Sequence, residues 1–175
     1  SWREPLAGLS PPVAAFPGGR IDPSRGGGSF EIRLHENADA MPRAFLVPRG
    51  RWIGPASDGP DGRGRWSREE RLALLRSGDF DPQRAVLLEG RDPQETPAPA
   101  DDGPIRAPVT IVSYGAERVH LRADAPRDCW LFLSDTYYPG WKAEVDGKAA
   151  AIRPANLVGR AVRFPAGRHD VVFSY

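Results

Sequence analysis

The residues whose types and spacing suit binding chemistry are gathered in the stretch SDTYYPGWKAEVDGK, positions 134–148. It contains Asp135, Tyr137 and Tyr138. An exposed aromatic ring can stack on the apolar face of a pyranose while a nearby carboxylate accepts its hydroxyl protons. Because adjacent residues of an extended chain point to opposite faces, we expect one tyrosine to be buried and the other to lie at a loop rim with Asp135. These residues form the candidate ligand-binding site.

The same stretch also has the pattern of a chain that turns twice. Pro139-Gly140 suits a type II turn, since proline presets φ at the first central position and glycine accepts a positive φ at the second. Asp146-Gly147 is the preferred pair of a type I′ hairpin. Between the turns Trp141 shares one face with Ala143 and Val145, which places its ring in the core. The alternative to a sugar site is therefore that these aromatic residues are architecture.

The elements that must position these side chains are mostly strands. Residues 30–35 and 118–124 alternate apolar and polar side chains, which is typical of a half-buried strand. Residues 109–175 form a succession of short apolar runs closed by Gly, Pro or Asp. The pattern predicts a mainly β chain, an antiparallel sandwich of jelly-roll or immunoglobulin-like type. We expect strands from 30–50 and 85–90 to complete its core.

One short helix is expected near 67–77. Ser67 with Glu70 three residues later forms a capping box, in which each residue accepts from the backbone N–H of the other. Gly78 is a suitable C-terminal stop, because glycine accepts the left-handed conformation that ends many helices. The helical content is too low for a parallel α/β sheet, which agrees with the mainly β prediction.

The chain is expected to hold one domain with irregular additions. Residues 1–29 are rich in Pro and Gly, which predicts an irregular N-terminal segment. Residues 30–175 are then a single β-sandwich domain. Within it, residues 91–108 are rich in Pro and Asp and are expected to form a surface loop.

Composition argues against several classes of site. The net charge of +1 gives no electrostatic basis for binding nucleic acid. Cys129 is the single cysteine, and its apolar neighbours indicate a small buried hydrophobe and not a nucleophile. Asp58, Asp61, Asp79 and Asp81 lack the spacing and the closing Glu of a calcium-binding loop. We expect no catalytic residue, no metal site and no cofactor.

Two further side chains have interpretations of their own. His169 shares a strand face with Val171 and Phe173, which favours a histidine that anchors a turn or packs in the core over a catalytic base. Arg43 follows Pro42, and we hypothesise that its guanidinium pairs with an acidic group such as Asp135.

The stretch 131–175 resembles the C-terminal extracytoplasmic segment of YfhO-type bacterial membrane proteins. Upstream, Asn37, Pro42, Arg43 and Ala44 match that family's Asn-x-x-x-x-Pro-Arg-Ala segment, and DFDPQRAVLLEG is similar to its Asp-Pro-x-x-x-Val-x-Leu-Glu segment. The resemblance covers residues 30–175 in the family's order. The C-terminal motifs that carry it are Ser134-Asp135, Tyr138 to Trp141, Val145 to Gly147, Asn156, Pro165 to Gly167, His169 and Phe173 to Tyr175.

The resemblance implies a parent chain that is a polytopic membrane protein grouped with the GT-C glycosyltransferases, which use lipid-phosphate-linked sugar donors. The catalytic acid of such a parent is expected near its first transmembrane helices, outside this chain. The implied function is an accessory domain, not itself an enzyme, on the extracytoplasmic face of the bacterial cell membrane. It would bind or position a cell-envelope glycan acceptor and contact the membrane helices of its own parent chain. The alternative is a non-catalytic interaction or scaffold domain with no sugar site.

Overall fold

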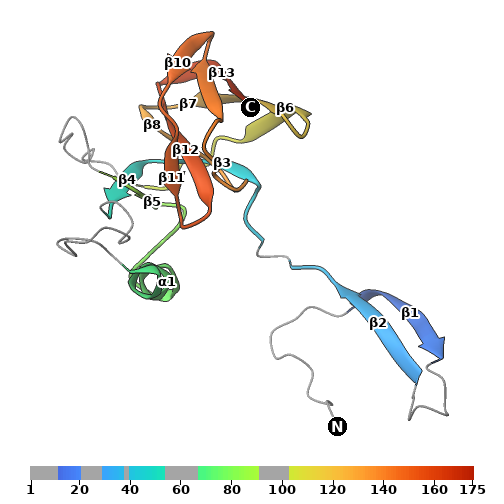
Figure 1. The fold of residues 1–175 in the computed structure, drawn as a ribbon. Helices are drawn as coiled ribbons and strands as arrows, with labels where there is room; N and C mark the ends of the chain where they lie inside the picture. The colour runs from blue at the N-terminus through green and yellow to red at the C-terminus, as the bar shows by residue number, and fades with distance from the viewer. Residues whose placement is uncertain (1–11, 21–28, 38–39, 54–66, 91–102) are drawn as a thin grey trace. The chain divides into compact units, whose positions relative to one another are not determined.

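The computed structural model describes residues 12–20, 29–37, 40–53, 67–90 and 103–175 (Figure 1). The chain divides into two compact units, Ser1–Pro42 and Arg43–Tyr175. The division falls at Pro42, whereas the sequence pattern placed the domain boundary after residue 29.

The first unit contains a β-hairpin. Strand β1 (Pro12–Arg20) pairs antiparallel with β2 (Ser29–His35). The prediction of irregular structure over 1–29 is therefore wrong for β1. Prolines are tolerated at the first residue of a strand and on edge strands, and both strands of a two-stranded sheet are edges. Because β2 pairs with β1, it belongs to neither larger sheet, contrary to the expectation that it completes the sandwich.

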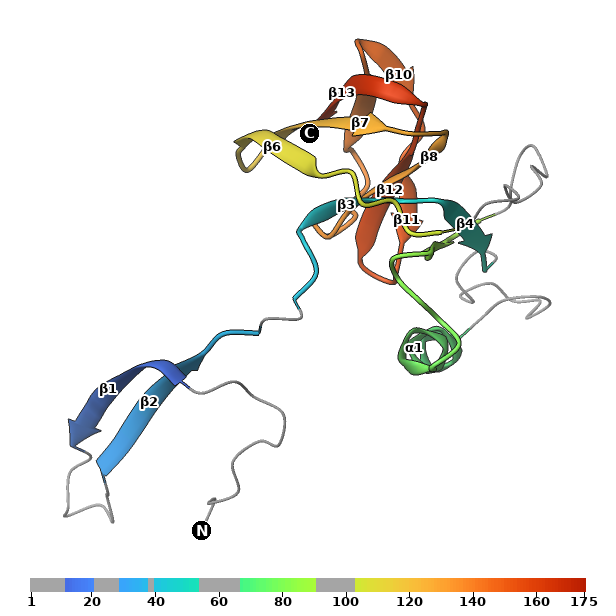
Figure 2. The same ribbon diagram turned by 180° about the vertical axis from the view of Figure 1, so that it is seen from behind.

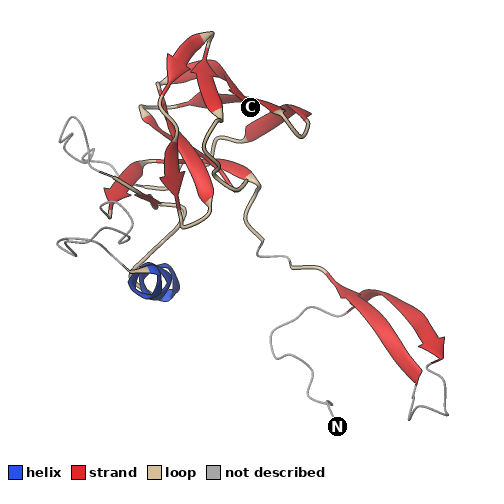
Figure 3. Ribbon diagram, in the orientation of Figure 1, coloured by secondary structure: helices blue, strands red, loops and turns tan. Residues whose placement is uncertain are grey.

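In its described residues the second unit is mainly β and sandwich-like, with two mostly antiparallel sheets and one short helix (Figure 3). The five-stranded sheet has the order β10-β9-β13-β7-β6. Its strands are β6 (Val109–Tyr114), β7 (Arg118–Ala125), β9 (Lys142–Val145), β10 (Lys148–Ala150) and β13 (Gly167–Ser174). Every pair of neighbours in this sheet is antiparallel.

The six-stranded sheet has the order β3-β8-β12-β11-β5-β4. Its strands are β3 (Ala44–Val47), β4 (Arg49–Trp52), β5 (Ala85–Leu88), β8 (Cys129–Leu133), β11 (Arg153–Ala155) and β12 (Gly159–Phe164). The pair β4–β5 is parallel, an exception to the predicted antiparallel pairing. A parallel pair needs a crossover connection, and the segment between these two strands contains the helix.

The main core lies between the two sheets. The buried side chains of β7 alternate as the sequence predicts, with Val119, Leu121 and Ala123 inward. They pack in one cluster with Leu131 of β8 and Phe164 of β12. Figure 2 shows β6 and β7 lying over β3, one strand layer on the other. The apolar faces of both sheets are removed from water by this packing, which is the main stabilising term of the unit.

The six-stranded sheet also curls. Trp130 and Phe132 of β8 point away from the main core and pack with Val86 and Leu88 of β5, although β12 and β11 separate these strands in the sheet. A Cβ atom on Gly50 of β4 would lie 2.8 Å from Trp130 Nε1. The bare backbone of Gly50 therefore lets the edge strand approach the indole ring directly.

Helix α1 (Arg68–Arg76) begins with the predicted capping box. The N–H of Glu70 donates to Ser67 Oγ over 3.1 Å, and the N–H of Ser67 donates to Glu70 Oε2 over 2.6 Å. Arg71 is buried and pairs with Glu89, which follows β5. Leu74 and Leu75 pack against a small cluster of Ile53, Phe80 and Leu87.

Candidate functional site

The stretch 134–148 makes both predicted turns. Gly140 has a φ of 107°, and the N–H of Trp141 donates to the carbonyl of Tyr138 over 3.4 Å, as in a type II turn. Asp146 and Gly147 have φ values of 50° and 76° and join β9 to β10, as in a type I′ hairpin. Ala143 is buried while Lys142 and Lys148 are exposed. Both predicted turns are confirmed, while Trp141, predicted to lie in the core, is half-buried.

The two candidate tyrosines lie in different environments. Tyr137 is half-buried, and its backbone N–H donates to the carbonyl of Val158 over 2.6 Å. Tyr138 is 59% exposed, and its ring centroid lies 6.3 Å from that of Tyr175, which is 63% exposed. We call Tyr138 and Tyr175 the tyrosine rim. Tyr138 is thus exposed and Tyr137 is partly covered, whereas the sequence predicted that one of the two would be buried.

Trp141 packs between the main core and the Tyr175 ring of the tyrosine rim. Its ring is half-buried against the main core and meets the Tyr175 ring edge-on at 5.8 Å. Glycine is needed at position 140 for two reasons. Its φ is positive, and a Cβ atom at this position would lie 2.9 Å from the Tyr175 ring. The Pro-Gly-Trp turn therefore places two exposed aromatic rings side by side.

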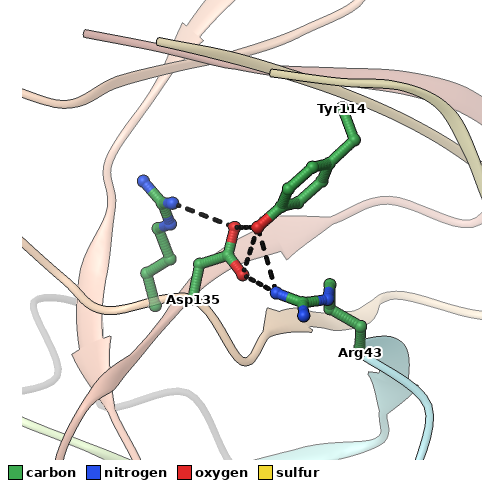
Figure 4. A network of polar contacts seen from close by, with 4 residues as sticks. Arg43, Tyr114 and Asp135 are labelled. Atoms are coloured by element: carbon green, nitrogen blue, oxygen red, sulfur yellow. Dashed lines mark hydrogen bonds and ion pairs between the residues drawn. The ribbon is translucent and has the colours of Figure 1, made fainter. Parts of the chain in front are cut away.

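Asp135 is held by three side chains from other parts of the unit (Figure 4). Arg43 Nη1 donates to its Oδ1 over 2.7 Å, and the Tyr114 hydroxyl lies 3.0 Å from both of its oxygens. Arg160 Nη2 lies 3.4 Å from its Oδ2. The hypothesised pairing of Arg43 with Asp135 is confirmed. The carboxylate has about four acceptor sites, so these contacts leave it little capacity for a ligand hydroxyl.

Arg160 is the buried cation of this network. Its side chain is 2% exposed, and its guanidinium lies 3.9 Å from the centroid of the Trp141 ring and 5.3 Å from that of Phe173. Its Nε and Nη1 atoms have no hydrogen-bond partner among the described residues. Burial lowers the pKa of Arg160, and the attraction to Asp135 opposes that shift.

Tyr114 and Arg43 complete the network at the surface. The pKa of Tyr114 is raised, first by burial of the hydroxyl and second by its hydrogen bond to Asp135. The phenol therefore stays protonated and can donate a hydrogen bond. The hydrogen bond to Asp135 raises the pKa of Arg43. Arg43 Nη1 also donates to the Tyr114 hydroxyl over 3.0 Å. The network therefore links β6 and β12 to the residue that precedes β3, and it fixes the start of the 134–148 stretch.

Sequence reasoning missed Tyr114 and Arg160 as partners of Asp135. One signal for Arg160 was present: it lies among apolar residues in the stretch LVGRAVRF, where a buried arginine requires a carboxylate or an aromatic face. Tyr114 ends an exposed strand and carried no comparable signal.

His169 anchors a turn, as predicted. Its Nδ1 lies 2.5 Å from Asp146 Oδ2, and its Nε2 lies 2.9 Å from the carbonyl of Ala166. Both ring nitrogens face acceptors, which favours the imidazolium. The hydrogen bond to Asp146 raises the pKa of His169, and the backbone N–H of Asp170 is the main cause that lowers the pKa of Asp146.

The other candidate sites gain no chemical role. Burial raises the pKa of the Cys129 thiol to about 12, so it is a buried hydrophobe and not a nucleophile. Asp81 accepts from the backbone N–H of Gln83, while Asp58 and Asp61 lie outside the described residues. Within the described ranges, no three His, Cys, Asp or Glu side chains are grouped as metal ligands would be.

No protein-family model, curated protein or solved structure matches this chain. In the part of the chain that the structure describes, no helix has the length and apolarity needed to cross a membrane.

Proposed function

We propose that this chain is an extracytoplasmic accessory domain of a polytopic, glycosyltransferase-like membrane protein, and that it binds or positions a cell-envelope glycan acceptor. The resemblance to YfhO-type proteins supports the membrane context. The observation that carries the binding role is the tyrosine rim, in which Tyr138 and Tyr175 expose 59% and 63% of their surface with ring centroids 6.3 Å apart. In this proposal the parent protein uses a lipid-linked sugar, and the domain itself performs no catalysis.

The rim is suited to a sugar because its rings are both exposed and held in place. Exposed aromatic rings offer flat apolar surface at a low entropy cost, since a tyrosine has few rotatable bonds. Gly140 and Trp141 fix the two rings through the contacts described above. The Asp135 network fixes the chain just before them. In this proposal Tyr138 contacts the sugar, while Asp135 and Tyr137 hold in place the chain segment that carries Tyr138.

The finer class of the sandwich is part of this proposal. We propose a jelly-roll or immunoglobulin-like type, because the chain repeatedly passes from one sheet to the other. After β7 it enters the six-stranded sheet at β8, returns at β9 and β10, and crosses again for β11 and β12 before β13. Such alternation is common in sandwiches with Greek-key connections.

Titration of the domain with bacterial cell-envelope oligosaccharides, followed by NMR, tests the glycan role. We expect binding in about the millimolar range or tighter, weakened roughly tenfold or more by Tyr138→Ala. Ile111→Ala is the matched control, because Ile111 is also apolar and exposed but lies on β6, outside the tyrosine rim. A flat response from a folded domain, or equal binding by Tyr138→Ala, would refute a glycan role for the tyrosine rim.

The second candidate is an interaction or scaffold domain with no sugar site. It is favoured by the engagement of Asp135 with three neighbours and by the apolar surface of β6. Ile111 and Val112 are 41% and 45% exposed on that strand, which ends the five-stranded sheet. An edge strand with apolar side chains can pair with another segment. A photo-crosslinker at position 112 of the full-length parent would identify such a segment.

A further inference from the structure

A concave region of the unit Arg43–Tyr175 is lined by neither Tyr138 nor Tyr175 and is therefore distinct from the tyrosine rim. Its volume is about 680 Å³, within the range of about 300–1,000 Å³ that small-molecule sites occupy. Both sheets line it: the β9–β10 hairpin supplies one wall, while β11 and β12 with Trp52 of β4 supply the other. Asp135, Tyr137 and Tyr138 are not among its lining residues. The cleft therefore needs an interpretation of its own.

Two tryptophans and two arginines lie together in this cleft. The Trp52 and Trp130 rings meet edge-on with centroids 6.0 Å apart. The guanidinium of Arg153 lies 5.5 Å from the Trp52 centroid, and that of Arg163 lies 4.4 Å from the Trp130 centroid. A guanidinium that stacks by its face keeps its N–H donors at its edge, where they suit a carboxylate or a phosphate.

Two cations of the cleft have no carboxylate partner among the residues that the structure describes. Arg153 and Lys148 make no ion pair and no side-chain hydrogen bond with any residue, counted over the described part of the chain. Arg153 is half-buried, so its guanidinium is partly removed from water without compensation by a charge. An anion placed between these two side chains would supply that compensation.

The carboxylates of the cleft are already engaged. Asp146 pairs with His169 over 2.5 Å and accepts from the backbone N–H of Asp170 over 2.9 Å. Asp128 accepts from the backbone N–H of Ala166 over 2.8 Å. These contacts hold the turns that border the cleft, and the acidic groups do not neutralise Arg153 or Lys148.

The rest of the lining is apolar. Val145, Ala149 to Ala151, Phe164 and Pro165 supply it together with the Trp52 ring. A ligand that fits must therefore combine an anionic group with a compact body that has an apolar face. A sugar ring meets this requirement, because its C–H face packs on aromatic and aliphatic side chains while its substituents carry the charge.

We propose that this cleft binds an anionic saccharide, a sugar ring that carries a phosphate or a carboxylate. The anionic group lies between Arg153 and Lys148, and the ring packs against Trp52 and the apolar wall. This site is separate from the tyrosine rim and does not depend on the role proposed for the rim.

The test is a titration of the 175-residue chain with four probes: glucose 6-phosphate, glucuronate, glucose and inorganic phosphate. The indole N–H signals of Trp52 and Trp130 are followed by NMR. We expect at least one of the two charged sugars to shift these signals and to bind at least about tenfold more tightly than glucose or inorganic phosphate. The stronger of the two identifies the anionic group as a phosphate or a carboxylate.

Variants locate the binding. Arg153→Gln and Lys148→Gln should each weaken binding of the charged sugar about tenfold, since each removes one charge-assisted hydrogen bond. Lys142→Gln is the matched control, because Lys142 lies on the same hairpin and is not among the lining residues. Lys148 is exposed, so its variant should keep the fold even if Arg153→Gln does not.

The proposal is overturned by equal binding of glucose, by equal binding of inorganic phosphate, or by unchanged binding in the folded Lys148→Gln and Arg153→Gln variants. Absence of binding by both charged sugars at about 10 mM, a concentration that saturates a millimolar site, also overturns it. Tyr138→Ala should leave this binding unchanged. Failure of the cleft and failure of the tyrosine rim are therefore distinguishable.

Discussion

Arg43 and Asp135, separated by 92 residues in the chain, are joined by an ion pair of 2.7 Å between Arg43 Nη1 and Asp135 Oδ1. The backbone strengthens this link, since the N–H of Ser134 donates to the carbonyl of Arg43 over 2.9 Å. Arg43 directly precedes β3, and Asp135 begins the stretch that leads to the tyrosine rim. The first strand of the six-stranded sheet is thus bound to the segment that carries the candidate site.

Asp135→Asn should destabilise the unit Arg43–Tyr175 by about 3 kcal/mol, because it leaves the buried Arg160 without a carboxylate. The Arg160 side chain is 2% exposed and that of Asp135 is 11% exposed, so solvent cannot replace the lost charge. Urea unfolding of the variant and the wild type measures this difference in free energy of unfolding.

Arg43→Gln is the control for that experiment. The Arg43 side chain is 53% exposed, so its ion pair with Asp135 is screened by water. We expect a cost of about 0–1 kcal/mol. If the two substitutions lower the free energy of unfolding equally, Asp135 does not stabilise the unit by compensating the buried charge of Arg160.

The turns and several strands were predictable because they depend on local chemistry. Pro139-Gly140 and Asp146-Gly147 restrict φ and ψ whatever surrounds them, and both turns have the expected form. The alternation in β7 likewise specifies its buried face. The pairing of Arg43 with Asp135 could be stated only as a hypothesis, because local sequence patterns do not show which distant residues come into contact.

The rest depends on tertiary packing that local patterns do not contain. The parallel pair β4–β5 depends on the crossover connection that contains α1, which the pattern of neither strand specifies. The burial of Arg160 requires Trp141 and Phe173 on its two sides, and these residues come from different parts of the chain. The hairpin strand β1 was missed because its prolines indicated a loop, although edge positions accept them.

Gly50→Ala should destabilise the second unit by about 2 kcal/mol, because the added methyl would overlap a packed ring. Its Cβ atom would lie 2.8 Å from Trp130 Nε1 and would also overlap Leu88. Thermal unfolding, with tryptophan fluorescence as the signal, measures the effect.

Gly78→Ala is the matched control for Gly50→Ala. A Cβ atom at Gly78 meets nothing within 4 Å, and Gly78 is not among the glycines with positive φ. We expect a change within about 0.5 kcal/mol. Equal effects at the two positions would show that β4 can move away from Trp130 without cost.

Cys129 should not react with Ellman's reagent at about pH 8 while the protein is folded. The thiolate is the reactive form, and burial raises the pKa of this thiol to about 12. Cys129 is the only cysteine, so the absorbance change reports this position alone. The thiol should react fully in guanidinium chloride. Fast, complete reaction of the folded protein would show that β8 is accessible.

The contribution of His169 to stability should fall as the pH rises. Its pKa in the folded protein is raised, mainly by the hydrogen bond to Asp146. A raised folded-state pKa means that the stabilisation is fully present below about pH 6.5, the pKa of an unfolded histidine, and is lost as the pH rises through the folded value. The lowered pKa of Asp146 keeps its carboxylate charged in that range, and its own contribution is lost only in acid.

His169→Gln therefore should cost more stability at about pH 5.5 than at about pH 8.5, by urea unfolding at both values. The ring contact with Phe164, at 5.6 Å, contributes at both pH values and cancels in the comparison. In an Asp146→Asn background the same substitution should show a much smaller dependence on pH, since the charged partner is gone. A cost that does not vary with pH in the native background would show that the imidazolium does not form in the turn, and that His169 acts there only through packing and neutral hydrogen bonds.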